Sequence, residues 1–274
     1  MQVIVAFFAI ALAVTLVVFI IWRGETEGHD DPPWVLSHLA GQHVFIMAGL
    51  AGFAVTGIVL TVGLLQGRST SSVALSTVVV MMFVAYFFYV GNAFLFSYFL
   101  PNRDGSKNVP SRVHFALGST IEYRTVFVSW LALMPLLDAY GLDLPRQVLG
   151  WLVPASMVFG AVIVMVVTAS VGLVRIREVI VTMILAAVLA HGYGISVHAF
   201  LPELRWDFSS MAVAIIIFGL NGVGFMLAAL TPLSVRYPAV ETFFETYGRR
   251  IVIADLASTV VALSLLGLAV AGTI

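Results

Sequence analysis

A small set of ionisable side chains lies within otherwise apolar stretches of the sequence, and these residues are the most able to do chemistry. They are His38, His43, Glu122, Arg124 and Asp255. An ionised group in hydrocarbon is costly unless another charge compensates it, so such residues mark functional sites in membrane proteins. We predict one buried network in which Arg124 compensates Glu122 or Asp255. The alternative is that they lie at the membrane surface, where their charged ends reach the lipid headgroups.

The composition indicates that a membrane surrounds these residues. Of the 274 residues, 61% are hydrophobic and 10% are charged, whereas about 25% of the residues of a soluble domain are charged. The net charge of −1 gives no basis for a nucleic-acid partner. The chain has no cysteine, which excludes disulfides, thiolate chemistry and cysteine metal sites. The sequence therefore predicts an all-α polytopic membrane protein in a lipid bilayer.

The apolar runs predict how many helices cross the bilayer. A hydrocarbon layer of about 30 Å needs about 20 apolar residues per helix. Eight runs qualify: 2–22, 36–66, 73–100, 120–140, 148–174, 178–203, 208–233 and 245–273. The polar residues 101–119 predict a loop. The prediction is an N-terminal transmembrane helix with a polar linker at 1–35, followed by a seven-helix bundle at 36–274.

Basic residues divide unevenly between the two ends of these spans. The rich end has nine: Arg23, Arg103, Lys107, Arg112, Arg175, Arg177, Arg236, Arg249 and Arg250. The other end has Arg68, Arg146 and Arg205. Loops rich in lysine and arginine stay in the cytoplasm. This bias predicts a multi-pass protein of the cell membrane with both termini outside.

Histidines in the apolar runs raise a second hypothesis, a b-type haem or quinone-linked electron-transfer subunit. His191 and His198 are seven residues apart, so they share one helix face, and pairs of histidines can hold haem iron. The different depths of these histidines in the membrane argue against a haem held by His191 and a histidine of the run 36–66. His191 lies about 20 Å from the inner end of its helix and His43 about 10 Å from its own. The pairs would be drawn from these three histidines and His38.

No motif for a nucleophile with its base, or for a set of metal ligands, is present, so an enzyme is not the favoured reading. Catalytic groups from separate helices would leave no local motif, which keeps enzymatic activity open. The chain's single lysine, Lys107, falls in the predicted loop. No predicted span can therefore form a Schiff base with an aldehyde.

Five parts of the chain carry a resemblance to a known family: LAGQHVFIMAGLAG, the polar loop 101–119, Ile121-Glu122-Tyr123, Ala155-Ser156-Met157 with Phe159-Gly160, and RRIVIADLAST. They resemble the microbial rhodopsins, and more closely the heliorhodopsins, whose orientation agrees with the charge bias. The resemblance implies a seven-helix bundle with Glu122 at the counterion position and His43 near the first-helix histidine. The retinal-binding lysine would fall at Ser258. In a second register it would fall at Thr259, with Asp255 at the second counterion position.

The second register rests on SWLALMPLL, which resembles the third helix of proton-pumping rhodopsins. Trp130 would match their tryptophan, and Ser129 stands where they have a carboxylate, so the resemblance does not imply pumping. Ser129, Trp130, Met157 and His191 would line a candidate pocket. The resemblance implies a lysine-less protein that binds retinal, a carotenoid or lipid without a covalent bond.

The favoured function is therefore a non-enzymatic ligand-binding or signalling membrane protein. It would act through a membrane or cytoplasmic protein partner, and a homo-oligomer is compatible with this hypothesis. A third hypothesis is a proton- or solute-conducting protein in which His43, Glu122 and Asp255 relay protons from the cytoplasmic side.

Overall fold

The computed structural model describes residues 34–66, 73–97, 109–142, 172–175, 177–182, 184–185 and 210–271. Its main elements are α2 (Trp34–Gln66), α3 (Val73–Ser97), α4 (Val109–Ala139), α7 (Ser210–Leu230), the 3-10 helix η3 (Thr231–Val235) and α8 (Pro238–Ala271). The prediction of an all-helical protein is confirmed for this part of the chain. The bundle of seven helices plus one is not shown. The run at 2–22 and most of 148–174 and 178–203 lie outside the described residues.

Within the residues that the structure describes, three stretches are long and apolar enough to cross a membrane. They are Ala40–Gly63 in α2, Leu75–Ser97 in α3, and Ala214–Val235 in α7 and η3. Their lengths of 24, 23 and 22 residues correspond to about 33 to 36 Å of helix, enough for a hydrocarbon layer of about 30 Å. Large apolar side chains cover their outer surfaces, such as Phe45 and Met226, which are 82% and 70% exposed. Helices that are apolar on all sides suit a lipid environment.

Helix α4 is longer than the sequence analysis predicts. It begins at Val109, so the loop expected over 101–119 is wrong for 109–119, which are helical. Pro110 lies at the start of the helix, where its missing N–H leaves no hydrogen bond unmade. The following turns are buried, with Val113 and Leu117 packed into the core. Tertiary burial therefore stabilises a helix in a segment whose polar residues favour a loop.

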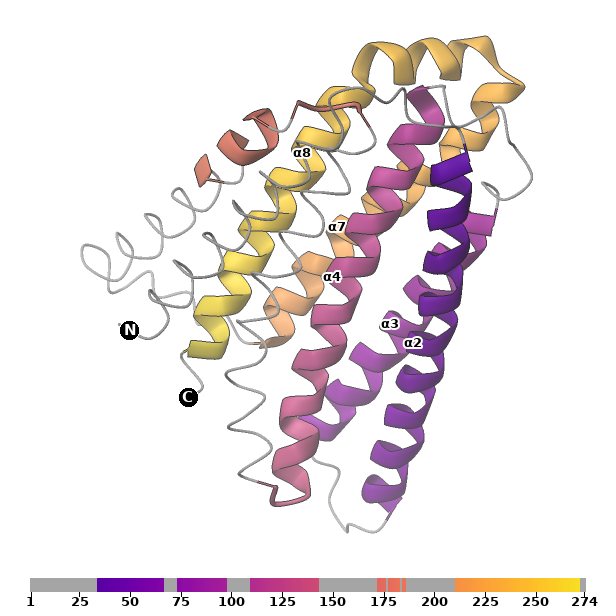
Figure 1. The fold of residues 1–274 in the computed structure, drawn as a ribbon. Coiled ribbons are helices and arrows are strands. Elements are labelled where there is room, and N and C mark those ends of the chain that lie inside the picture. The colour runs from indigo at the N-terminus through magenta and orange to yellow at the C-terminus, as the bar shows by residue number, and fades with distance from the viewer. Residues whose placement is uncertain are drawn as a thin grey trace.

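Helix α4 is the centre of the described bundle. It contacts α2, α3, α7 and α8, and Figure 1 shows it between α8 on one side and α2 and α3 on the other. One apolar cluster joins α2, α3, α4, α7 and α8 around Met82 and Phe127. A second joins α3, α4, α7 and α8 around Leu117 and Phe244. A polar side chain on α4 is therefore placed to meet partners from several helices.

Candidate functional site

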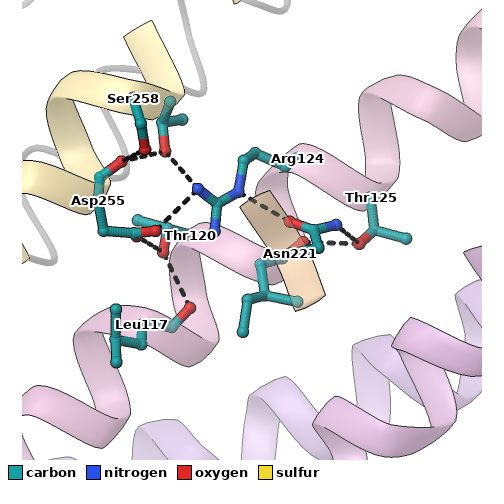
Figure 2. A network of polar contacts seen from close by, with 9 residues as sticks. Leu117, Thr120, Arg124, Thr125, Asn221, Asp255 and Ser258 are labelled. Atoms are coloured by element: carbon teal, nitrogen blue, oxygen red, sulfur yellow. Dashed lines mark hydrogen bonds and ion pairs between the residues drawn. The ribbon is translucent and has the colours of Figure 1, made fainter. Parts of the chain in front are cut away.

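Arg124 of α4 lies at the heart of a polar cluster and has no exposed surface. Its Nη1 donates to Oδ1 of Asp255 at 2.8 Å and to Oγ1 of Thr259 at 3.1 Å. Its Nε donates to Oδ1 of Asn221 at 2.8 Å. Figure 2 shows the guanidinium between α8, which carries Asp255, and α7, which carries Asn221. A guanidinium stays protonated, so the carboxylate of Asp255 provides the charge compensation that burial requires.

Asp255 is held from two helices. Its carboxylate accepts hydrogen bonds from Arg124 and from the hydroxyl of Thr120, both on α4. Its backbone carbonyl accepts from the hydroxyls of Ser258 at 2.8 Å and Thr259 at 2.7 Å. The two positions that the resemblance assigns to a retinal-binding lysine therefore carry hydroxyls bonded to this same aspartate.

Asn221 brings α7 into the cluster, although its place among small residues does not predict a site residue. Its Nδ2 donates to Oγ1 of Thr125 at 2.9 Å, while its Oδ1 accepts from Arg124. Gly224 lies one turn further along α7, where a Cβ atom would come within 3.2 Å of Nη2 of Arg124. In the sequence, Asn221 stands out only as an amide between the glycines of GLNGVG. The small residues of this stretch indicate close helix packing.

A second pair joins α2 to α4. Nδ1 of His43 contacts Oε2 of Glu122, and the two side chains are 18% and 12% exposed. The imidazole stacks on Phe96 at a centroid distance of 4.9 Å and meets the edge of Phe115 at 5.5 Å. The contact is an ion pair when the imidazole is protonated and a hydrogen bond when it is neutral.

The structure arranges the four central residues of the expected network as two pairs on α4. Glu122 pairs with His43, and Arg124 pairs with Asp255. Two residues along a helix correspond to about 200° of rotation, so these neighbouring side chains leave α4 on opposite sides. Arg124 therefore compensates Asp255 rather than Glu122, which has an imidazole from α2 as its partner.

Ser129 and Trp130, expected in a ligand pocket, lie on α4 one to two turns beyond Arg124. Ser129 is buried, donates to the carbonyl of Thr125 at 3.1 Å and accepts from the phenol of Tyr89 at 2.9 Å. Trp130 is half-buried against the apolar cluster around Met82 and Phe127. These contacts place Ser129 in the packing between α3 and α4, and Trp130 beside the apolar cluster.

The remaining predicted residues are not placed together by the described part of the chain. His38 belongs to α2, but its side chain is outside the described set. Met157, His191 and His198 also lie outside the described residues. The pocket and the haem-ligand pairs that involve them stay predictions.

His114 is a further buried polar residue, which the sequence analysis placed in the expected loop. The residue is only 2% exposed. Nε2 lies 3.1 Å from the carbonyl oxygen of Leu95, and Nδ1 lies 3.0 Å from that of Ala228 and 2.5 Å from Oγ1 of Thr231. The ring therefore connects α4 to the ends of α3 and α7. The sequence does not predict His114 as a site residue because residues 109–119 are expected to form a loop, whereas they are helical.

Among the described residues, no group of three or more histidine, aspartate or glutamate side chains is arranged to hold a metal ion. Comparisons of the chain with protein-family models, curated proteins and solved structures found no match. The arrangement around α4 is thus the basis for a functional proposal.

Proposed function

We propose that the chain is a multi-pass protein of the cell membrane in which a rhodopsin-like bundle of seven helices follows an N-terminal helix. It acts as a non-enzymatic ligand-binding or signalling protein, without a covalently attached chromophore. The observation that carries the proposal is the buried pair of Arg124 and Asp255, 2.8 Å apart. Nη1 of the same arginine also bonds to Thr259, one of the two positions that would hold a retinal-bearing lysine.

The pair supports this function because the guanidinium of Arg124 supplies the positive charge that a protonated Schiff base would otherwise place beside Asp255. A protonated Schiff base needs a carboxylate counterion, and here the guanidinium of Arg124 already pairs with Asp255. A guanidinium does not release its proton in proteins. The pair thus links α4 to α8, and its arginine does not take part in moving protons.

A ligand of the bundle would be retinal, a carotenoid or a lipid held by packing and hydrogen bonds. The signal would pass to a membrane or cytoplasmic protein, or to a second copy of the chain, through a shift of α8 relative to α4. Because Asp255 bonds to Thr120 and Arg124 on α4, such a shift must break or exchange these contacts.

The test is the absorption spectrum of the purified full-length protein, together with mass spectrometry of its organic extract. We expect any bound chromophore to be extracted intact by organic solvent without hydroxylamine, and the extracted chain to keep its unmodified mass. A retinal adduct on the intact chain, detected as added mass after borohydride reduction, would contradict the proposal. A Soret band that shifts on addition of dithionite would favour the haem hypothesis instead.

Proton conduction is a second candidate, favoured by the contact between His43 and Glu122. An imidazole beside a carboxylate inside a membrane is a common arrangement in proton relays. In liposomes with a pH gradient, the parent protein would then carry a proton flux that Glu122→Gln abolishes. Glu241→Gln is the matched control, because Glu241 is exposed near the start of α8. The absence of flux in the parent would reject this candidate.

A further inference from the structure

The surface around the start of α8 combines exposed arginines with exposed aromatic rings. We call it the arginine–aromatic surface, and its residues are Arg175, Arg177, Arg236, Tyr237, Phe243, Tyr247, Arg249 and Arg250. The three aromatic residues are 52%, 40% and 44% exposed. Figure 1 shows the first turns of α8 running across the end of the bundle before the helix descends beside α4.

Two observations indicate the depth of this surface. The apolar stretch of α7 and η3 ends at Val235, and Arg236 and Tyr237 follow it directly. Further along α8, a Cβ atom on Gly248 would lie 2.6 Å from Cγ2 of Val113, which places α8 against the start of α4. We therefore infer that the arginine–aromatic surface lies where the hydrocarbon layer ends and the headgroups begin.

The charge of the surface is positive. The surface has five arginines, whereas the same region has three glutamates, Glu178, Glu241 and Glu245. Arg249 pairs with Glu178. In the part of the chain that the structure describes, Arg236 and Arg250 form no ion pair. Their guanidinium groups are therefore available to an anion from outside the chain.

The chemistry of this surface matches a phospholipid headgroup. A guanidinium binds phosphate oxygens through two parallel hydrogen bonds, and aromatic rings favour the boundary between hydrocarbon and headgroups. We propose that the arginine–aromatic surface binds the phosphate groups of anionic phospholipids in the adjacent leaflet. A soluble acidic protein fits less well, because the rings adjoin an apolar span at the depth of the headgroups. This inference does not depend on the proposed function.

The test uses the full-length protein in nanodiscs of phosphatidylcholine with increasing phosphatidylglycerol, and native mass spectrometry counts the retained lipids. We expect R236Q/R250Q to bind phosphatidylglycerol about 30-fold more weakly than the parent, because each arginine near an anionic surface contributes a factor of about five. R236K/R250K keeps the charge but loses the paired guanidinium hydrogen bonds, so it should bind more tightly than R236Q/R250Q and more weakly than the parent. Gel filtration and thermal unfolding check that each variant is folded.

Two results would overturn the inference. One is equal retention of phosphatidylglycerol by the parent and R236Q/R250Q, which would leave the surface to a soluble protein partner. The other is a parent that retains both lipids equally. Should R236Q/R250Q fail to fold, the single variant R236Q gives the same test with an expected weakening of about five-fold.

Discussion

At the scale of single residues, the two carboxylates that form ion pairs at α4, Asp255 and Glu122, have different partners. Asp255 pairs with a guanidinium that has no exposed surface, whereas Glu122 pairs with an imidazole that is partly exposed. The first partner is always charged, and the second is charged only when protonated. Only the Asp255 pair therefore contains a partner that is permanently charged.

Breaking the buried pair should cost more than removing both of its members. We expect Arg124→Met to lower the free energy of unfolding by about 3 to 5 kcal/mol, because it leaves the carboxylate of Asp255 without a cation. The double variant Arg124→Met/Asp255→Leu should recover a large part of this loss. Denaturant unfolding of the parent, both single variants and the double variant in detergent measures the coupling. A double variant as unstable as the sum of the singles would contradict it.

The two contacts of the His43 ring can be separated by substitution. His43→Phe retains a ring to stack on Phe96 but leaves Glu122 without its partner, at an expected cost of about 1 to 3 kcal/mol. His43/Glu122→Phe/Leu removes the unpaired carboxylate and should regain stability. Thermal unfolding of the full-length protein measures both effects. If His43→Phe is as stable as the parent, the contact with Glu122 does not stabilise the fold.

At the scale of helices, the sequence identified the polar residues but not their pairing. His43, Glu122, Arg124 and Asp255 stand out as charges in apolar runs, and this can be read directly. Their partners depend on the rotation of α4 against α2 and α8, which apolar periodicity does not specify when a helix is apolar on all sides. Asn221 was missed because an uncharged amide among small residues resembles a packing motif.

Close packing of α3 against α4 should make Gly118 intolerant of a side chain. A Cβ atom there would lie 2.6 Å from Cζ of Phe96, the ring on which His43 stacks. We expect Gly118→Ala to destabilise the protein by about 1 to 3 kcal/mol. Gly49→Ala on α2 is the matched control: a Cβ there meets no atom within 4 Å, so helix propensity should stabilise it by up to about 1 kcal/mol. Thermal unfolding of both variants distinguishes steric clash from a general glycine effect.

At the scale of the whole molecule, the described helices place the two ends of the bundle far apart. Val109 begins α4 near the arginine–aromatic surface, and α4 continues for 31 residues to Ala139, about 45 Å at 1.5 Å per residue. The predicted spans 36–66, 73–100 and 208–233 correspond to observed helices, since long apolar runs are a direct consequence of bilayer thickness. Orientation leaves no trace in helix geometry, and the charge bias alone predicts it.

The predicted orientation can be tested directly because the chain has no cysteine. Glu245→Cys lies on the arginine–aromatic end of α8, and Leu142→Cys follows the opposite end of α4; both positions are exposed. In intact cells, a membrane-impermeant maleimide should label Leu142→Cys but not Glu245→Cys, and permeabilised cells should label both. The reverse pattern would invert the topology and place both termini inside. Labelling of both positions in intact cells would mean that α4 does not cross the membrane, and the proposed bundle would then be wrong.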